Sequence, residues 1–144
     1  MYIRNYLAPC LLVLLLAFPC PAAAFEAAGW KQQGPEIHAE HFLNLLVEWR
    51  VEDAFISLLG SERADTVIEL KQDLEGEYGK SGKPLGYERI LKQRVGSSLI
   101  RLRYLLLFPK MPKVFDLYYY NPDGQGWELR TFTYGRDIKS AFKE

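Results

Sequence analysis

Apolar and polar residues alternate along the second half of the chain in a pattern that predicts four consecutive β-strands. Runs rich in β-branched and aromatic residues are separated by clusters of Gly, Pro, Asn and Asp, which are typical of turns. The predicted strands comprise residues 87–95, 98–108, 114–120 and 126–134. Short connections between successive strands predict an antiparallel meander, in which each strand pairs with the next.

The second predicted strand has one apolar face and one mixed face, because successive side chains of a strand point to opposite sides. Its mixed face carries Arg101 and Arg103, so we expect the middle of that face to contact water. Its apolar face is expected to contact the core, and it consists of Ile100, Leu102, Tyr104, Leu106 and Phe108.

The first half of the chain shows helical spacing instead. Apolar residues recur at three- and four-residue steps over residues 38–59, with a polar break at residues 50–53. This pattern predicts two helical pieces, or one bent helix, with Gly60 at the C-terminus. The apolar positions are Phe42, Leu45, Leu46 and Trp49, followed by Ala54, Phe55, Leu58 and Leu59.

Two further helices are predicted. Thr66 and Glu69 have the spacing of a capping box, which predicts a helix beginning at Thr66. Its apolar stripe consists of Val67, Leu70, Leu74 and Tyr78. A last short helix is expected over residues 137–142, and its apolar contacts would be Ile138 and Phe142.

Helices followed by a meander predict the α+β class, with N-terminal helices packed on one face of a curved, four-stranded antiparallel sheet. No internal repeat or low-complexity tract indicates a second domain, so residues 37–144 are expected to form one domain. Residues 25–36 are expected to be a flexible leader, because Gly29, Gly34 and Pro35 interrupt them.

The beginning of the chain has the layout of a secretory signal peptide. Arg4 precedes a short apolar run, and small residues stand at Ala22 and Ala24, which predicts cleavage before Phe25. The apolar run is short for a membrane span, so we expect contact with a membrane only through this segment before its removal; the alternative is an uncleaved membrane anchor. The protein is therefore expected to be exported, periplasmic or secreted.

Both cysteines, Cys10 and Cys20, lie in the segment to be removed, so no disulfide or thiolate chemistry is expected afterwards. Phe18 and Pro19 precede Cys20, and they do not match the small residues of a lipidation site. The chain has 18 basic and 18 acidic residues, and this balance predicts neither nucleic-acid binding nor attraction to an anionic membrane.

The order of these elements resembles the nuclear-transport-factor-2-like branch of the cystatin-like folds, and in particular its small secreted bacterial members with no assigned activity. The resemblance covers most of residues 37–142. It is carried by Ala39-Glu40-His41-Phe42-Leu43 through Glu52-Asp53-Ala54-Phe55, the strand 99–108, Tyr118-Tyr119-Tyr120, Gly126-Trp127-Glu128-Leu129, and Asp137-Ile138. It implies a cone between helices and sheet, and a fold that hosts isomerases, hydratases, binding domains and homodimers.

Enzymes of this group, such as ketosteroid isomerase and scytalone dehydratase, place Asp, Tyr or His side chains in the cone. The corresponding rows of this chain are apolar, with phenols at Tyr104 and Tyr119 and no carboxylate. Asp53 is the nearest candidate for a general base, and either phenol is a candidate donor. If the cone instead binds an apolar ligand, the expected contacts are Trp49, Tyr104, Tyr119 and Trp127.

The outer face of the sheet supplies a second candidate site. Folding residues 109–113 as a turn would place Arg103 beside Tyr118 and Arg101 beside Tyr120, and these four residues are the candidate partner-binding set. The alternative is a solvated ladder that stabilises the sheet by about 0.2–1 kcal/mol per pair. Across the last turn, the expected pairs are Asp116 with Arg130, Tyr118 with Glu128, Leu117 with Leu129 and Tyr119 with Trp127.

Metal and phosphate sites are not expected. His38 and His41 would share a helical face, but zinc requires at least three protein ligands, so solvated histidines are the preferred interpretation. Gly79-Lys80-Ser81 lacks the earlier glycine of a phosphate-binding loop, since Leu74 stands at that position. No cofactor is therefore expected.

Three hypotheses follow from the sequence. The first is a non-catalytic domain that binds a protein partner through its sheet or a small apolar ligand in its cone. The second is a small isomerase or dehydratase with Asp53 as base. The third is a homodimer in which two sheets pack together and whose role is assembly.

Overall fold

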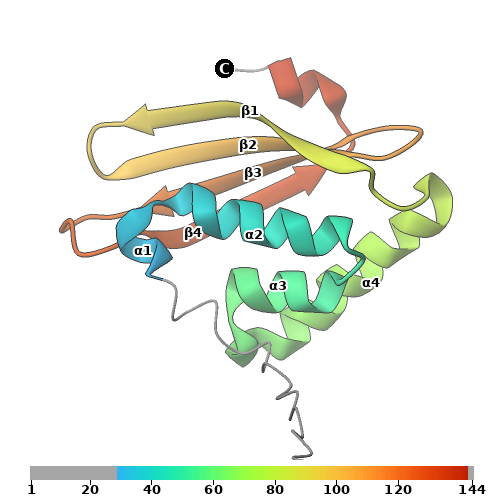
Figure 1. The fold of residues 1–144 in the computed structure, drawn as a ribbon, viewed down its shortest axis with the longest axis horizontal. Helices are drawn as coiled ribbons and strands as arrows, with labels where there is room; N and C mark the ends of the chain where they lie inside the picture. Colours follow the sequence, from blue (N-terminus) through green and yellow to red (C-terminus); the bar gives the residue numbers. More distant parts are fainter. Residues whose placement is uncertain (1–28, 143–144) are drawn as a thin grey trace, which may run out of the picture.

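The computed structural model describes residues 29–142, apart from the side chains of residues 78–81. It shows helices followed by a four-stranded antiparallel sheet that is not closed, which confirms the α+β class (Figure 1). The predicted signal peptide, its cleavage site and residues 25–28 of the expected leader lie outside the described residues.

The four strands lie in the predicted places and in the order β1-β2-β3-β4. Each strand pairs only with its neighbours along the chain, so the predicted meander is confirmed. The strands are β1 (Gly86–Val95), β2 (Leu99–Leu107), β3 (Lys113–Tyr120) and β4 (Glu128–Gly135).

The helices precede the sheet and cover one of its faces. In Figure 1, α2 lies along the sheet, and α3 and α4 lie beyond α2 as seen from the sheet. A 3-10 turn, η2 (Ser61–Arg63), joins α3 to α4. The helices are α1 (Trp30–Gln33), α2 (Pro35–Val47), α3 (Val51–Leu59) and α4 (Ala64–Ser81).

Residues 29–36 differ from the expected flexible leader. They contain α1 and the first residues of α2, and Pro35 suits a first helical position because its missing N–H would be unpaired there. Trp30 is only 6% exposed and stacks on the imidazole ring of His38. This segment therefore belongs to the packed domain, and burial of the Trp30 ring supplies the reason.

The predicted break between two helical pieces is confirmed, but Trp49 does not lie on the helix. Its φ is 69°, and its N–H donates to the carbonyl of Leu46 while the N–H of Arg50 donates to that of Leu45. These two bonds form a Schellman motif, in which glycine normally takes the left-handed position. Trp49 is consequently 43% exposed instead of continuing the apolar stripe.

The start of α4 was predicted wrongly. The helix begins at Ala64, directly after η2, so Thr66 lies inside the first turn and cannot act as its N-cap. Val67 and Leu74 of the predicted stripe are buried, and Leu70 is partly buried. The helix predicted from the apolar stripe is therefore confirmed, whereas its beginning, which was predicted from the capping box, is wrong.

The core lies between α2, α3 and the inner face of the sheet. The predicted apolar face of β2 is confirmed, because each of its five members is at most 6% exposed. The largest fully buried side chains are Tyr104, Tyr119, Phe42, Phe55, Phe115, Leu43, Leu46, Leu74, Ile100, Leu102, Leu106 and Leu117.

The register across the β2–β3 connection was predicted wrongly by two residues. Lys113 belongs to β3 and pairs with Leu106, which moves every later pair. Arg101 therefore lies opposite Tyr118, and Arg103 lies opposite Asp116.

The expected β3–β4 pairs are wrong as well. Next to the turn the register already differs by two residues, since Tyr119 lies opposite Leu129, and a bulge between the partners of Tyr118 and Tyr119 shifts the later pairs by one residue more. Arg130 is the residue left without a cross-strand partner. The observed pairs are Asp116 with Thr133, Leu117 with Phe132, Tyr118 with Thr131, Tyr119 with Leu129 and Tyr120 with Glu128.

The last predicted helix forms as a 3-10 turn, η3 (Ile138–Phe142), but without the expected apolar contacts. Ile138 and Phe142 are 46% and 84% exposed. The turn lies on the side of the sheet away from the helices (Figure 1), where the carbonyl of Ala141 accepts a hydrogen bond from Arg103. Arg103 is therefore 2% exposed, and the expectation that this part of the outer face contacts water is wrong.

Candidate functional site

An ion-paired cluster forms the centre of the outer sheet face. The Nε of Arg101 donates to Oδ1 of Asp116 at 2.8 Å, and the Nε of Arg103 donates to the same oxygen at 3.0 Å. Register explains this geometry, because Asp116 lies directly opposite Arg103 and diagonally opposite Arg101. Asp116 is 7% exposed, so one nearly buried carboxylate holds both guanidinium groups in fixed positions.

A partly exposed aromatic surface lies beside the cluster. The guanidinium of Arg101 lies 5.6 Å from the ring centroid of Tyr118, and that of Arg130 lies 5.6 Å from the ring of Tyr120. Val95, Leu99 and Tyr120 form one cross-strand row and are all exposed. We call Val95, Leu99, Arg101, Tyr118 and Tyr120 the outer patch.

Of the four predicted partner-binding residues, the structure brings Arg101, Tyr118 and Tyr120 together at the outer patch. Arg103 lies below them as a buried support. Sequence analysis missed Asp116 as the group that joins the two arginines, because the signal depends on a register that the chain alone did not specify.

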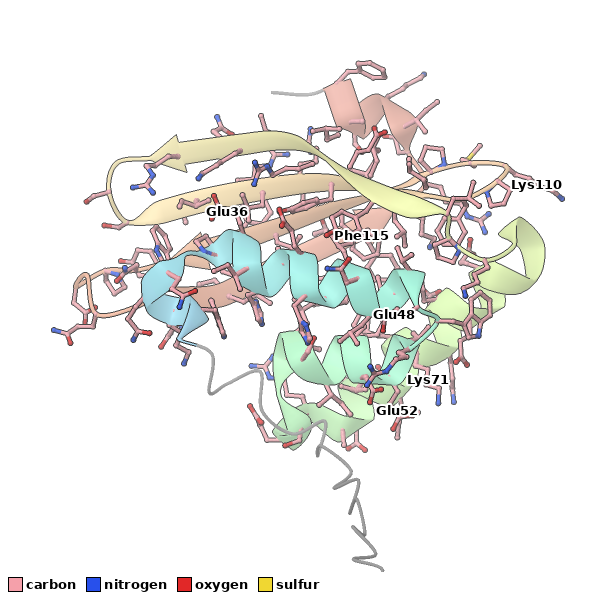
Figure 2. All side chains as sticks on the ribbon, in the orientation of Figure 1. Glu36, Glu48, Glu52, Lys71, Lys110 and Phe115 are labelled. Carbon is pink, nitrogen blue, oxygen red and sulfur yellow. The ribbon has the colours of Figure 1, made fainter. Side chains whose placement is uncertain are left out.

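On the inner face, Tyr104 is fully buried and is joined to a carboxylate from α2. Its hydroxyl donates to Oε1 of Glu40 at 3.3 Å, and Arg89 of β1 lies 3.5 Å from the same oxygen. Burial, followed by the negative charge of Glu40, raises the pKa of Tyr104 above its usual value. Phe115, which Figure 2 labels between the sheet and α2, is also fully buried.

Glu40 was missed because α2 was treated as having only an apolar face toward the core. Glu36, Glu40 and Asn44 are spaced by four residues, which places them in one row along the helix. This row lies beside β1, because Lys92 of that strand pairs with Glu36, which Figure 2 labels. An acidic row on a helix and a basic strand are a signal that sequence analysis could have used.

Tyr119 belongs to a separate buried chain of hydrogen bonds. His38 Nε2 lies 2.9 Å from the carbonyl of Ser57, so Nε2 carries the proton that is donated there. His38 Nδ1 then accepts the hydroxyl proton of Tyr119 at 3.0 Å. The indole of Trp30 stacks on the imidazole at 4.1 Å.

These contacts explain the acid–base properties of the buried pair. Burial is the largest cause of the low pKa of His38, which falls from 6.5 to about 4, while its bond to Ser57 acts in the opposite direction. Burial also raises the pKa of the Tyr119 hydroxyl well above its usual value. Both groups are neutral near pH 7, and His38 is a structural core residue instead of the solvated histidine that the sequence predicted.

Among the described residues, the three catalytic candidates form hydrogen bonds with three different partners. Asp53 lies at the beginning of α3, where its carboxylate accepts a hydrogen bond from Nε of Arg50 at 2.9 Å, and its side chain is 44% exposed. Tyr104 bonds to Glu40, and Tyr119 bonds to His38. Each candidate is therefore occupied by a different partner.

The four candidate ligand-binding residues occupy different environments as well. Trp49 is exposed at the end of α2, whereas Tyr104 and Tyr119 are fully buried within the core. Trp127 is 8% exposed, and its backbone N–H donates to the carbonyl of Lys31. The centroid of its ring lies 5.7 Å from the guanidinium of Arg94. Tyr104, Tyr119 and Trp127 therefore pack in the interior, whereas Trp49 does not.

Within the described part of the chain, no group of three or more His, Cys, Asp or Glu side chains is placed to hold a metal ion. None of the described helices is both long enough and apolar enough to cross a bilayer.

Comparisons of the chain with protein-family models, with curated proteins and with solved structures gave no match. The fold class and the candidate sites therefore rest on the sequence and on the geometry described above.

Proposed function

We propose that this protein is an exported, non-catalytic interaction domain that binds a protein partner through the outer patch. The observation that carries the proposal is the fixed position of Arg101, whose guanidinium is bound to Asp116 and lies over Tyr118. Arginine and tyrosine are enriched at the energetic centres of protein interfaces. Side chains that are already ordered lose less conformational entropy when a partner binds.

The outer patch also indicates the chemistry of the partner. Leu99 and Tyr120 offer apolar and aromatic area, while Arg101 uses only Nε and Nη2 for Asp116. A guanidinium has five N–H donors, so the others are available to an acceptor oxygen. The matching partner surface presents apolar side chains together with a carboxylate or carbonyl group that contacts Arg101.

The fold assignment extends this proposal. Helices that precede an antiparallel meander and cover one of its faces support membership of the nuclear-transport-factor-2-like branch of the cystatin-like folds. Export is supported by the signal-peptide pattern of residues 1–24. Intact mass of the protein from its host's envelope fraction tests export, because cleavage before Phe25 would remove the first 24 residues.

The binding proposal is tested by affinity capture from the same envelope fraction, followed by reconstitution with the purified candidate partner. Two variants address the patch: a double variant Arg101→Ala with Tyr118→Ala, and the single variant Tyr120→Glu. Ile68→Ala is the matched control, because Ile68 is an exposed apolar residue on α4. Circular dichroism confirms that each variant is folded.

The proposal requires a purified partner that binds the wild type and the Ile68→Ala variant, and that binds both patch variants at least about tenfold more weakly. Equal affinity for the wild type and for both patch variants would exclude the outer patch. Sedimentation velocity at several concentrations distinguishes a second copy of this chain from a different protein, since a homodimer that the patch variants dissociate would identify the partner as the chain itself.

A further inference from the structure

Strand β4 forms one edge of the sheet, and its far side has no paired strand among the described residues. Unpaired N–H and C=O groups along such an edge can accept an additional strand. The opposite edge strand, β1, is rich in charged residues that discourage pairing, namely Glu88, Arg89, Lys92 and Arg94. Beyond its bulge, β4 instead continues as Thr131, Phe132, Thr133 and Tyr134.

A hollow of about 210 Å³ lies beside this edge. It is lined by Leu58 and Leu59 of α3, by Arg63 of η2 and by residues 129–132 of β4. Around the bulge, Leu129 and Phe132 lie opposite inward-facing residues of β3, whereas Thr131 lies opposite the outward-facing Tyr118. A hollow that residues of both faces line runs along the edge of the strand. An added strand would therefore pass directly by the hollow.

The size of the hollow indicates what it can hold. Binding sites for small molecules usually have volumes of about 300–1,000 Å³, so this hollow is small for an independent ligand. Its lining is mixed: Leu58, Leu59, Leu129 and Phe132 supply an apolar part that can contact one apolar side chain, and Arg63, Arg130 and Thr131 supply a polar part. A side chain attached to a strand paired with β4 would fill it, which is the arrangement of peptide recognition by β-strand addition.

The charges around the hollow are both positive. Arg63 and Arg130 are its only charged lining residues. Arg130 pairs with Glu128 at 3.0 Å, whereas Arg63 forms no ion pair with any described residue, although Glu62 and Asp65 flank it in the sequence. An arginine at the rim of the hollow favours a carboxylate on the incoming segment.

We propose that the β4 edge and this hollow, together the edge site, bind an extended peptide segment of a partner protein, with an apolar side chain in the hollow and a neighbouring carboxylate on Arg63. This site adjoins the outer patch, since Arg130 lies over Tyr120, but it uses the strand edge and Arg63 instead of Arg101. The carboxylate is either an Asp or Glu side chain or the C-terminus of the segment.

Nuclear magnetic resonance of the isotope-labelled full chain tests the edge site with four synthetic peptides. The first is acetyl-Thr-Val-Thr-Leu-Thr-Asp-Thr amide. In the second and third, Ser replaces the Leu and Lys replaces the Asp. The fourth is acetyl-Thr-Val-Thr-Leu with a free C-terminal carboxylate, and its amide form is the corresponding control.

The proposal predicts that the first or the fourth peptide shifts the amide signals of residues 128–135 and the methyl signals of Leu58 and Leu59. Replacement of the Leu or loss of the carboxylate should weaken binding roughly tenfold or more. Arg63→Gln should have a similar effect, while Arg94→Gln on the opposite edge strand should have none. Leu59→Trp, which fills the hollow, should abolish binding in a folded protein.

Four results would overturn the proposal. The Lys peptide could bind as tightly as the Asp peptide, which would remove the role of Arg63. The peptides could shift signals of β1, or no signals at millimolar concentration. Signals of β4 could depend on protein concentration without any peptide, which would show that a second copy occupies this edge. Loss of binding at the outer patch would change none of these measurements, so the two proposals fail independently.

Discussion

His38 and Tyr119, which stand 81 positions apart in the sequence, share a buried hydrogen bond of 3.0 Å. The bond joins the beginning of the helical half to the third strand of the sheet. It depends on a neutral imidazole whose Nε2 proton is donated to Ser57, so the charge state of one residue affects the packing of helices on the sheet. Four predictions follow from this bond and from other buried or strained groups.

The protein is expected to lose stability as the pH falls from 6.5 toward 4. The pKa of His38 is about 4 in the folded state and 6.5 without burial, so the unfolded state takes up the proton first. The contribution of His38 to the free energy of unfolding is fully present above about pH 6.5. It decreases by about 3 kcal/mol as the pH falls to 4. Urea unfolding across this range measures the change.

A His38→Gln variant separates this contribution from the titration of other groups. It should be less stable than the wild type at pH 7 but show a shallower decrease between pH 6.5 and 4. His41→Gln is the comparison variant: the charge of His41 lowers the pKa of His38 less than burial does, and His41 is only partly buried, so this variant should retain most of the slope. Identical slopes for the wild type and His38→Gln would contradict the prediction. Lys31 also acts on the pKa of His38, which makes equal salt concentrations necessary.

Removal of the Tyr119 hydroxyl is expected to destabilise the fold at neutral pH. Tyr119→Phe leaves the Nδ1 of His38 buried without its donor, which costs about 1–3 kcal/mol. Tyr118→Phe is the matched control, since the neighbouring side chain is partly exposed on the other face of the sheet. Chemical denaturation should therefore separate the two variants, and equal midpoints would show that the hydrogen bond contributes little.

Replacement of Asp116 is expected to have the largest effect among the charged residues of the sheet. Asp116→Ala removes the carboxylate that both arginines contact and leaves the guanidinium of Arg103 in a nearly buried position. Loss of one partner of a buried ion pair costs about 3–5 kcal/mol. Glu128→Gln, which breaks the exposed pair with Arg130, should cost less than about 1 kcal/mol. Equal free energies of unfolding for the two variants would refute this difference.

Backbone strain at Trp49 is expected to make the glycine variant at this position more stable than the alanine variant, which is the reverse of their usual order. Trp49→Ala and Trp49→Gly lose the same indole, but only glycine relieves the left-handed conformation with φ of 69°. The glycine variant should be more stable by about 1 kcal/mol. Thermal or urea unfolding of the pair measures this difference directly. A more stable alanine variant would show that residue 49 does not adopt this conformation in solution.

Local patterns predicted the elements of the sheet well. Alternation along β2 identified the five side chains that contact the core, and Gly, Pro, Asn and Asp clusters located the turns. The break between α2 and α3 was also predicted, although the role of Trp49 in it was not. These features were accessible because they depend on residues that are close in the sequence.

The candidate sites were harder to predict from the sequence. The pairing of Arg101 and Arg103 with Asp116 required the correct register, and a shift of two residues assigned both arginines to the wrong neighbours. The β3–β4 register also differed by two residues next to the turn, and a bulge at Arg130 added one residue more. Neither the length of a loop nor the place of a bulge follows from alternation alone.

By itself, the sequence determined the α+β class, the order of the strands and the apolar face of β2, because periodicity specifies which side chains must leave water. Only the tertiary structure decided that Arg103 and His38 are buried, that Tyr104 contacts Glu40, and that a hollow lies beside β4. These features arise where segments distant in the sequence meet. Their polar groups are then set by the partners available inside the fold, which a one-dimensional pattern does not contain.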